Sequence, residues 1–158
     1  MIDLIEREKV NPVSIETPVY ADAIEGRCLC GDVTIHVGRH RAELGACHCT
    51  RCRRWSGVAL NVFTAEPDQV RVDGDVAIYP GEIAERAFCP RCGTSLWLRN
   101  PGEVYEFMVG VFDGAKDYPL ISEIYIDRAF ASCRFAGDHK RATQADYEAK
   151  NPFIAEDA

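Results

Sequence analysis

Long hydrophobic runs are missing from this chain of 158 residues, and no apolar stretch approaches the length that a membrane-spanning helix needs. The opening residues, MIDLIEREKVNP, mix acidic with apolar side chains and lack the hydrophobic region of a secretory signal. Positive charge is also scarce, because 18 Lys and Arg are outnumbered by 25 Asp and Glu, giving a formal net charge of −7. We therefore expect a cytoplasmic protein with no membrane partner and no nucleic-acid partner.

Internal repeats, low-complexity tracts and linkers are absent as well, so we expect a single folding unit. Apolar residues make up 47% of the chain, which is enough to form a hydrophobic core without covalent cross-links. Against this ordinary background the chain contains eight cysteines. Disulfides rarely persist in the cytosol, so these cysteines predict metal ligands.

Short strands dominate the predicted secondary structure. In residues 31–37, Val33, Ile35 and Val37 alternate with polar side chains, which is the pattern of a half-buried strand. Thr143 and Asp146 are typical of a helix start, and Pro152 is expected to end that helix. The other predicted strands are 58–63, 70–72, 76–79, 95–98, 104–109 and 123–126. We divide the chain into an N-terminal arm (1–24), a mainly β domain (25–133) and a C-terminal tail with a short helix (134–158).

Two cysteine clusters have complementary spacing. The segment C-P-R-C-G places Cys89 and Cys92 on a tight turn, where both thiols can face one ion. In an extended segment, Cys28 and Cys30 leave the backbone on the same side and supply a second pair. Together they predict a closed four-sulfur zinc site, which would tie the start of the domain to its middle and contribute to folding.

The remaining cluster, Cys47, Cys49 and Cys52, is too compact to serve three separate sites. Three ligands with a free fourth position are typical of catalytic zinc, so we expect an open site here and about two zinc ions per chain. A different grouping, with these three joined to Cys89 and Cys92, stays open. His48 is expected to be solvent-facing or to lie behind the ligands rather than to bind metal.

The ordered motifs resemble one family. G-R-C-L-C-G-D-V, C-H-C-T-R-C-R-R-W-S-G and R-A-F-C-P-R-C-G-T-S-L, followed by G-V-F-D, are similar to the glutathione-dependent formaldehyde-activating enzymes and centromere-protein-V-like domains. The resemblance spans residues 25–130. It implies an Mss4-like β-tent of antiparallel sheets with two zinc ions, and it assigns the structural and open sites to the same cysteines.

The resemblance also implies a carbon–sulfur lyase that interconverts S-hydroxymethylglutathione with formaldehyde and glutathione. Three thiolate ligands weaken zinc as a Lewis acid, which favours thiol exchange over water activation. Glutathione carries two carboxylates, so Arg53 or Arg54 is a candidate anchor for it, although either can instead pair with nearby acids. Trp55 is expected in the core rather than as a stacking wall, and Cys133 as a buried apolar residue.

Two other functions compete with the enzyme. A non-catalytic, zinc-stapled module that binds a protein would need only the four-cysteine site, since a fold does not fix a function. A nucleic-acid-binding zinc ribbon is disfavoured by the acidic balance. Exposed strand edges make a homodimer a candidate assembly.

Overall fold

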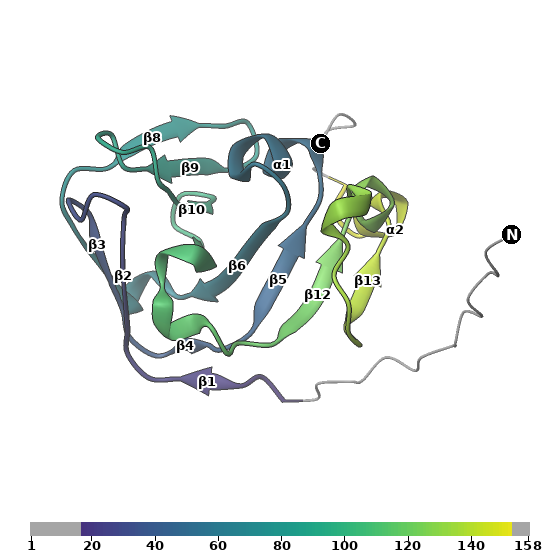
Figure 1. Ribbon diagram of the computed structural model, residues 1–158, viewed down its shortest axis with the longest axis horizontal. Coiled ribbons are helices and arrows are strands. Elements are labelled where there is room, and N and C mark those ends of the chain that lie inside the picture. Colours follow the sequence, from purple (N-terminus) through teal and green to yellow (C-terminus); the bar gives the residue numbers. More distant parts are fainter. Residues whose placement is uncertain (1–16, 153–158) are drawn as a thin grey trace, which may run out of the picture.

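The computed structural model describes residues 17–152, which fold mainly into β-strands joined by short helices and turns (Figure 1). The first part of the predicted N-terminal arm, residues 1–16, and the last residues of the predicted tail, 153–158, lie outside the described residues. In the described part, no helix is both long enough and apolar enough to cross a membrane.

The strands of the described residues are short, each of two to six residues. They are β1 (Tyr20–Ala21), β2 (Ile24–Arg27), β3 (Thr34–Val37), β4 (His40–Arg41), β5 (Leu44–Cys47), β6 (Leu60–Ala65), β7 (Val70–Asp73), β8 (Ala77–Pro80), β9 (Glu85–Phe88), β10 (Ser95–Arg99), β11 (Tyr105–Met108), β12 (Leu120–Ile124) and β13 (Lys140–Ala142). The α-helices are α1 (Thr50–Ser56) and α2 (Gln144–Glu148), and single 3₁₀ turns span Pro67–Gln69, Val109–Val111, Asp113–Ala115, Ile126–Arg128 and Ala131–Cys133.

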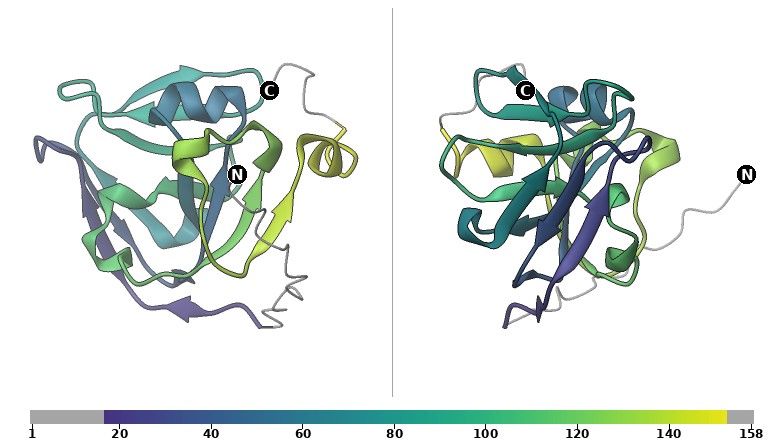
Figure 2. Two further views of the ribbon diagram at one scale, coloured as in Figure 1. Left: turned by 45° about the vertical axis from the view of Figure 1, so that its right-hand side comes forward. Right: turned by 90° about the vertical axis from the view of Figure 1, so that its left-hand side faces the viewer.

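An eight-stranded sheet in the order β13-β12-β5-β6-β11-β10-β9-β8 forms most of the molecule. A three-stranded sheet, β2-β3-β7, lies to one side of it, and β1 pairs with β4 (Figures 1 and 2). The mainly β class with a short C-terminal helix is thereby confirmed. The sheets are antiparallel except at β12, which runs parallel to both β5 and β13, so the large sheet is mixed.

The two faces of the large sheet pack against different hydrophobic cores. Phe107 is paired with Phe63 on one side and Trp97 on the other, and these rings pack with Ile35 and Val37 of β3 into the larger core. Because side chains alternate along a strand, Leu98 and its neighbour Glu106 point to the opposite face. That face carries a second core, in which Leu60, Leu98 and Tyr125 pack beside Cys47, Cys49 and Cys52.

Candidate metal centres and their cavity

Two matching turns present the first cysteine cluster. After β2, the amide of Gly31 donates to the carbonyl of Cys28 (3.1 Å), and after β9 the amide of Gly93 donates to the carbonyl of Cys89 (2.9 Å). Both glycines have positive φ, 85° and 73°, which side-chain-bearing residues rarely adopt. The expected extended segment at Cys28–Cys30 is therefore wrong, because this segment is a second metal-knuckle-like turn.

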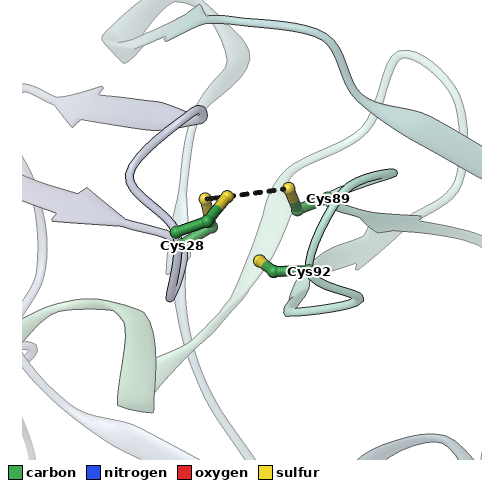
Figure 3. A group of neighbouring side chains, drawn as sticks. Cys28, Cys89 and Cys92 are labelled. Atoms are coloured by element: carbon green, nitrogen blue, oxygen red, sulfur yellow. Dashed lines mark hydrogen bonds between the residues drawn. The ribbon is translucent and has the colours of Figure 1, made fainter.

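The two turns bring four sulfur atoms together. The Sγ atoms of Cys28, Cys30, Cys89 and Cys92 all lie within 4.8 Å of one another, with 3.5 Å between Cys28 and Cys30 and 3.7 Å between Cys30 and Cys89. Figure 3 shows Cys28 approaching from one turn, and Cys89 and Cys92 from the other. Thiolates bound tetrahedrally at 2.3 Å from zinc lie ~3.8 Å apart. The four donors therefore fit a zinc ion.

Polar contacts join the two turns around these sulfurs. The amide of Leu29 donates to Thr94 Oγ1 (3.1 Å), and Arg91 donates to both carboxylate oxygens of Asp32 (2.9 and 3.0 Å). Hydrogen bonds with the side chain and backbone of Thr94 lower the pKa of the Cys92 thiol to about 5. This thiol is thus already poised as a thiolate ligand.

The second cluster is built at the junction of β5 and α1. Cys47 ends the strand, Cys49 is the N-cap of the helix, and Cys52 lies in its first turn. The amide of Cys52 donates to Cys49 Sγ (3.4 Å), so a sulfur takes the place of the usual capping oxygen. Neither this helix nor its cysteine cap was predicted from the sequence, because a seven-residue helix without an acidic or hydroxyl cap gives little signal.

Three thiols meet in this cluster, all with sulfur atoms within 4.8 Å of one another. Contacts with Cys47 and Cys52 lower the pKa of Cys49, whereas the contact with Cys49 and burial raise the pKa of Cys47. Without a cation only part of the cluster can ionise, since like charges oppose each other. A divalent cation would stabilise all three thiolates, so this donor set also fits zinc. The alternative grouping with Cys89 and Cys92 does not occur, because those two belong to the other cluster.

A cavity of about 280 Å³ opens beside the three-cysteine cluster. Its walls include Cys47, Cys49 and Cys52, together with the apolar side chains of Leu60, Leu98 and Ile124. Arg86 of β9 and Glu106 of β11 face it from the sheet, and Tyr125 and Tyr147 face it from the C-terminal part. Arg86 is 8% exposed and its Nε atom has no hydrogen-bond partner, which gives the cavity a buried positive charge.

His48 points away from the sulfurs and into a buried carboxylate. It is fully buried, and its Nε2 lies 2.6 Å from Glu123 Oε1, while His139 Nε2 lies 2.8 Å from the other oxygen. Arg141 donates to the same carboxylate (3.3 Å). The solvent-facing interpretation of His48 is therefore wrong, because the ring is buried and contacts Glu123. Glu123 and His139 were not singled out from the sequence, because only the sheet pairing brings them together.

The other predicted site residues lie around the helix. Arg53 stacks its guanidinium over the ring of Phe130 (4.4 Å) and donates to Thr50, and Arg54 is exposed. Neither lines the cavity, and their role in binding stays a prediction. Trp55 packs against the second core as expected. Cys133 is only half-buried, in a 3₁₀ turn, so its expected burial is wrong.

Comparison with known proteins agrees with this geometry. The sequence profile of the family described as glutathione-dependent formaldehyde-activating enzyme matches residues 23–128. An uncharacterized lyase of Schizosaccharomyces pombe is 29% identical over 107 residues, which cover 65% of this chain and 78% of that protein. A Halomonas elongata protein, named as a candidate glutathione-dependent formaldehyde-activating enzyme, is 34% identical over 90 residues, covering 49% of this chain and 57% of that protein.

A solved structure is also similar. The crystal structure of a Rhodobacter sphaeroides protein aligns with a TM-score of 0.50 at 27% identity, covering 61% of this chain and 99% of that one. The fold and the paired cysteine clusters thus define a small β protein with two clusters that could hold metal ions. By the profile match, the chain belongs to the glutathione-dependent formaldehyde-activating enzyme family.

Proposed function

We propose that this protein is a zinc-dependent enzyme of the carbon–sulfur lyase type, which joins glutathione or a similar thiol to a small aldehyde such as formaldehyde and reverses that addition. The observation that carries the proposal is the cavity lined by the three cysteines and by a buried arginine. The family to which the chain belongs supports glutathione and formaldehyde as substrates. The Mss4-like topology implied by the resemblance is part of this proposal.

The two clusters are proposed to have different roles. Cys28, Cys30, Cys89 and Cys92 would hold a zinc ion that stabilises the fold, and Cys47, Cys49 and Cys52 would hold one that faces the cavity. A zinc ion with three thiolate ligands supplies a positive charge that favours the deprotonated form of an added thiol or polarises a carbonyl oxygen. All eight cysteines are free thiols, which suits a reducing compartment such as the cytoplasm.

The chain's own side chains would orient the reactants. The apolar walls formed by Leu60, Leu98 and Ile124 exclude water, which favours an adduct that water would otherwise release. The buried guanidinium of Arg86 offers hydrogen bonds to a carboxylate of the thiol or to the oxygen of the aldehyde. This position, rather than that of Arg53 or Arg54, is inside the cavity.

Exchange of ¹³C-formaldehyde with its glutathione adduct tests the proposal, measured by NMR with zinc-loaded protein. The wild type should accelerate exchange over the uncatalysed rate, and Cys52→Ser should lower that acceleration at least ~100-fold, since removing one metal ligand disrupts the open site. Cys133→Ser, outside both clusters, should behave as the wild type.

Failure of the wild-type protein to accelerate exchange with any thiol tested would overturn the enzymatic proposal. The non-catalytic binding module would then be the better account, because such a module needs only the four-cysteine site.

A further inference from the structure

Glu106 shares one face of the large sheet with the three-cysteine cluster. Residues directly opposite each other in an antiparallel pair place their side chains on the same face. Leu98 lies opposite both Arg86 and Glu106, so these three side chains form a row across β9, β10 and β11. Glu106 also lies opposite Thr64 of β6, and Leu60, four residues earlier in β6, lies opposite Cys47. The sheet therefore points Glu106 towards the cysteine side.

The cavity brings Glu106 and the cysteines to a common space. Glu106 lines the same 280 Å³ volume as Cys47, Cys49 and Cys52. It is half-buried, and no hydrogen bond or ion pair joins it to another side chain in residues 17–152. A carboxyl in this position is open to a ligand and is not committed to the fold.

The other ionisable side chains around the cavity bond to other side chains, stay protonated or carry a positive charge, opposite to that of a carboxylate. Arg99 is held by Glu85 (2.8 Å), and the hydroxyl of Tyr125 donates to Glu148 (3.1 Å). Burial raises the pKa of Tyr147, so its hydroxyl stays protonated at neutral pH. Glu103 is exposed at the rim, where it accepts a hydrogen bond from Asn100 (3.1 Å). Glu106 is thus the carboxylate inside the cavity that is best placed to exchange a proton.

The electrostatics at Glu106 suit a group that gains and loses a proton. Burial raises its pKa above the ordinary value, and the positive charge of Arg86 opposes that rise. A general acid–base group works best when its pKa lies near the working pH. The burial and the nearby guanidinium thus act on this carboxyl in opposite directions.

We propose that Glu106 is the proton carrier of the reaction, an inference that rests on the proposed function. The S–H proton of the thiol moves to the Glu106 carboxylate. The sulfur then bonds to the carbonyl carbon, the C=O π pair moves to oxygen, and Glu106 returns its proton to that oxygen to give S–CH₂–OH. No proton is gained or lost overall, and no oxidant or reductant is needed.

Calorimetry of glutathione binding to zinc-loaded protein, without aldehyde, tests this step. Titrations at pH 7 in buffers of different ionisation enthalpy report the protons that binding releases. Ligation as a thiolate frees about one proton per thiol. Wild-type protein should retain that proton on Glu106, whereas Glu106→Gln should release it to the buffer. Glu106→Asp should restore retention, and Glu103→Gln at the rim should match the wild type.

The outcomes separate the two proposals. If the wild type binds no glutathione, the proposed function fails. Glu106 is not the carrier if the wild type and Glu106→Gln bind glutathione with equal proton release. The same conclusion follows if Glu103→Gln releases the proton as Glu106→Gln does. In both cases the proposed thiol-binding site is still supported. If Glu106→Gln does not fold, the wild type and Glu106→Asp are compared instead. Release of the proton to the buffer by the wild type would then overturn the carrier role.

Discussion

Glu123 is a buried carboxylate, 3% exposed, that links the loop of the three-cysteine cluster to the C-terminal segment. It joins His48, which lies between Cys47 and Cys49 in the sequence, to His139 and Arg141 of the C-terminal segment. A buried charge is costly unless hydrogen bonds compensate it, and here three side chains do so. The result is a loop whose position depends on residues about ninety positions later in the sequence.

Burial by itself would raise the pKa of Glu123, but hydrogen bonds with His139 and His48 outweigh it and hold the pKa below its ordinary value of 4.5. Glu123 therefore stabilises the fold at any pH above 4.5, and this stabilisation is lost as the pH falls through the lower pKa of the folded state. Glu123→Gln should cost about 2 kcal/mol at pH 7 and remove this acid-dependent part. Urea unfolding as a function of pH measures both.

Glu25→Gln is the matched control for this prediction. Glu25 also pairs with a histidine, His36 (3.1 Å), but its side chain is 64% exposed. Exposed ion pairs contribute little, so this change should leave the unfolding curve nearly unaltered. Equal effects of the two substitutions would show that the buried carboxylate has no special role.

Residue identities predicted the two cysteine clusters but not their surroundings. The spacing of the cysteines was sufficient to group Cys28 and Cys30 with Cys89 and Cys92, because few local geometries bring such pairs to one ion. Arg86 and Glu106 carry no local signal. They enter the cavity only because the register of β9, β10 and β11 puts them on one face, and that register is not evident from a single sequence.

At the scale of elements, the segment after the family match completes the cavity. The matched region ends at residue 128, whereas β13 extends the large sheet beside β12, and α2 follows it. Tyr147 of α2 packs at a tilt against Tyr125 (5.5 Å between ring centroids) and lines the cavity. This segment therefore sets the size of the space beside the three cysteines.

Tyr147→Ala should widen the range of aldehydes that the cavity accepts. Removing the ring opens one wall, so the ratio of kcat/KM for propanal to that for formaldehyde should rise about tenfold. Tyr147→Phe keeps the ring and should preserve the wild-type ratio. Steady-state kinetics with both aldehydes measure the ratio, and an unchanged ratio in the alanine variant would refute a role for α2 in substrate size.

Elements with a clear local pattern were predicted well. Alternation identified β3, and the capping box of Thr143 with Asp146 identified the start of α2, which ends at Glu148, before Pro152. β5 and β9 are among the strands that were missed, because neither alternates: all four residues of β5 are apolar or glycine, and β9 has two charged residues followed by two apolar ones. β12 was placed too late, because its pairing with β5 and β13 fixes its start.

At the scale of the whole molecule, the large sheet separates two cores. The three-stranded sheet covers one face with an aromatic core, and the other face carries the three-cysteine cluster and its cavity. The four-cysteine cluster joins the two sheets, through β2 and β9. The first cluster is therefore placed to hold the fold together, and the second to meet a ligand.

The most direct test of this division is the zinc content of native protein beside a Cys47→Ser, Cys49→Ser, Cys52→Ser triple variant, by elemental analysis with thermal melts of both. We predict that zinc falls from about two ions per chain to about one, while the variant stays folded, because four sulfurs still form a closed site. About one zinc ion in both proteins, with unchanged melting, would show that the three-cysteine cluster binds no metal and would contradict the account.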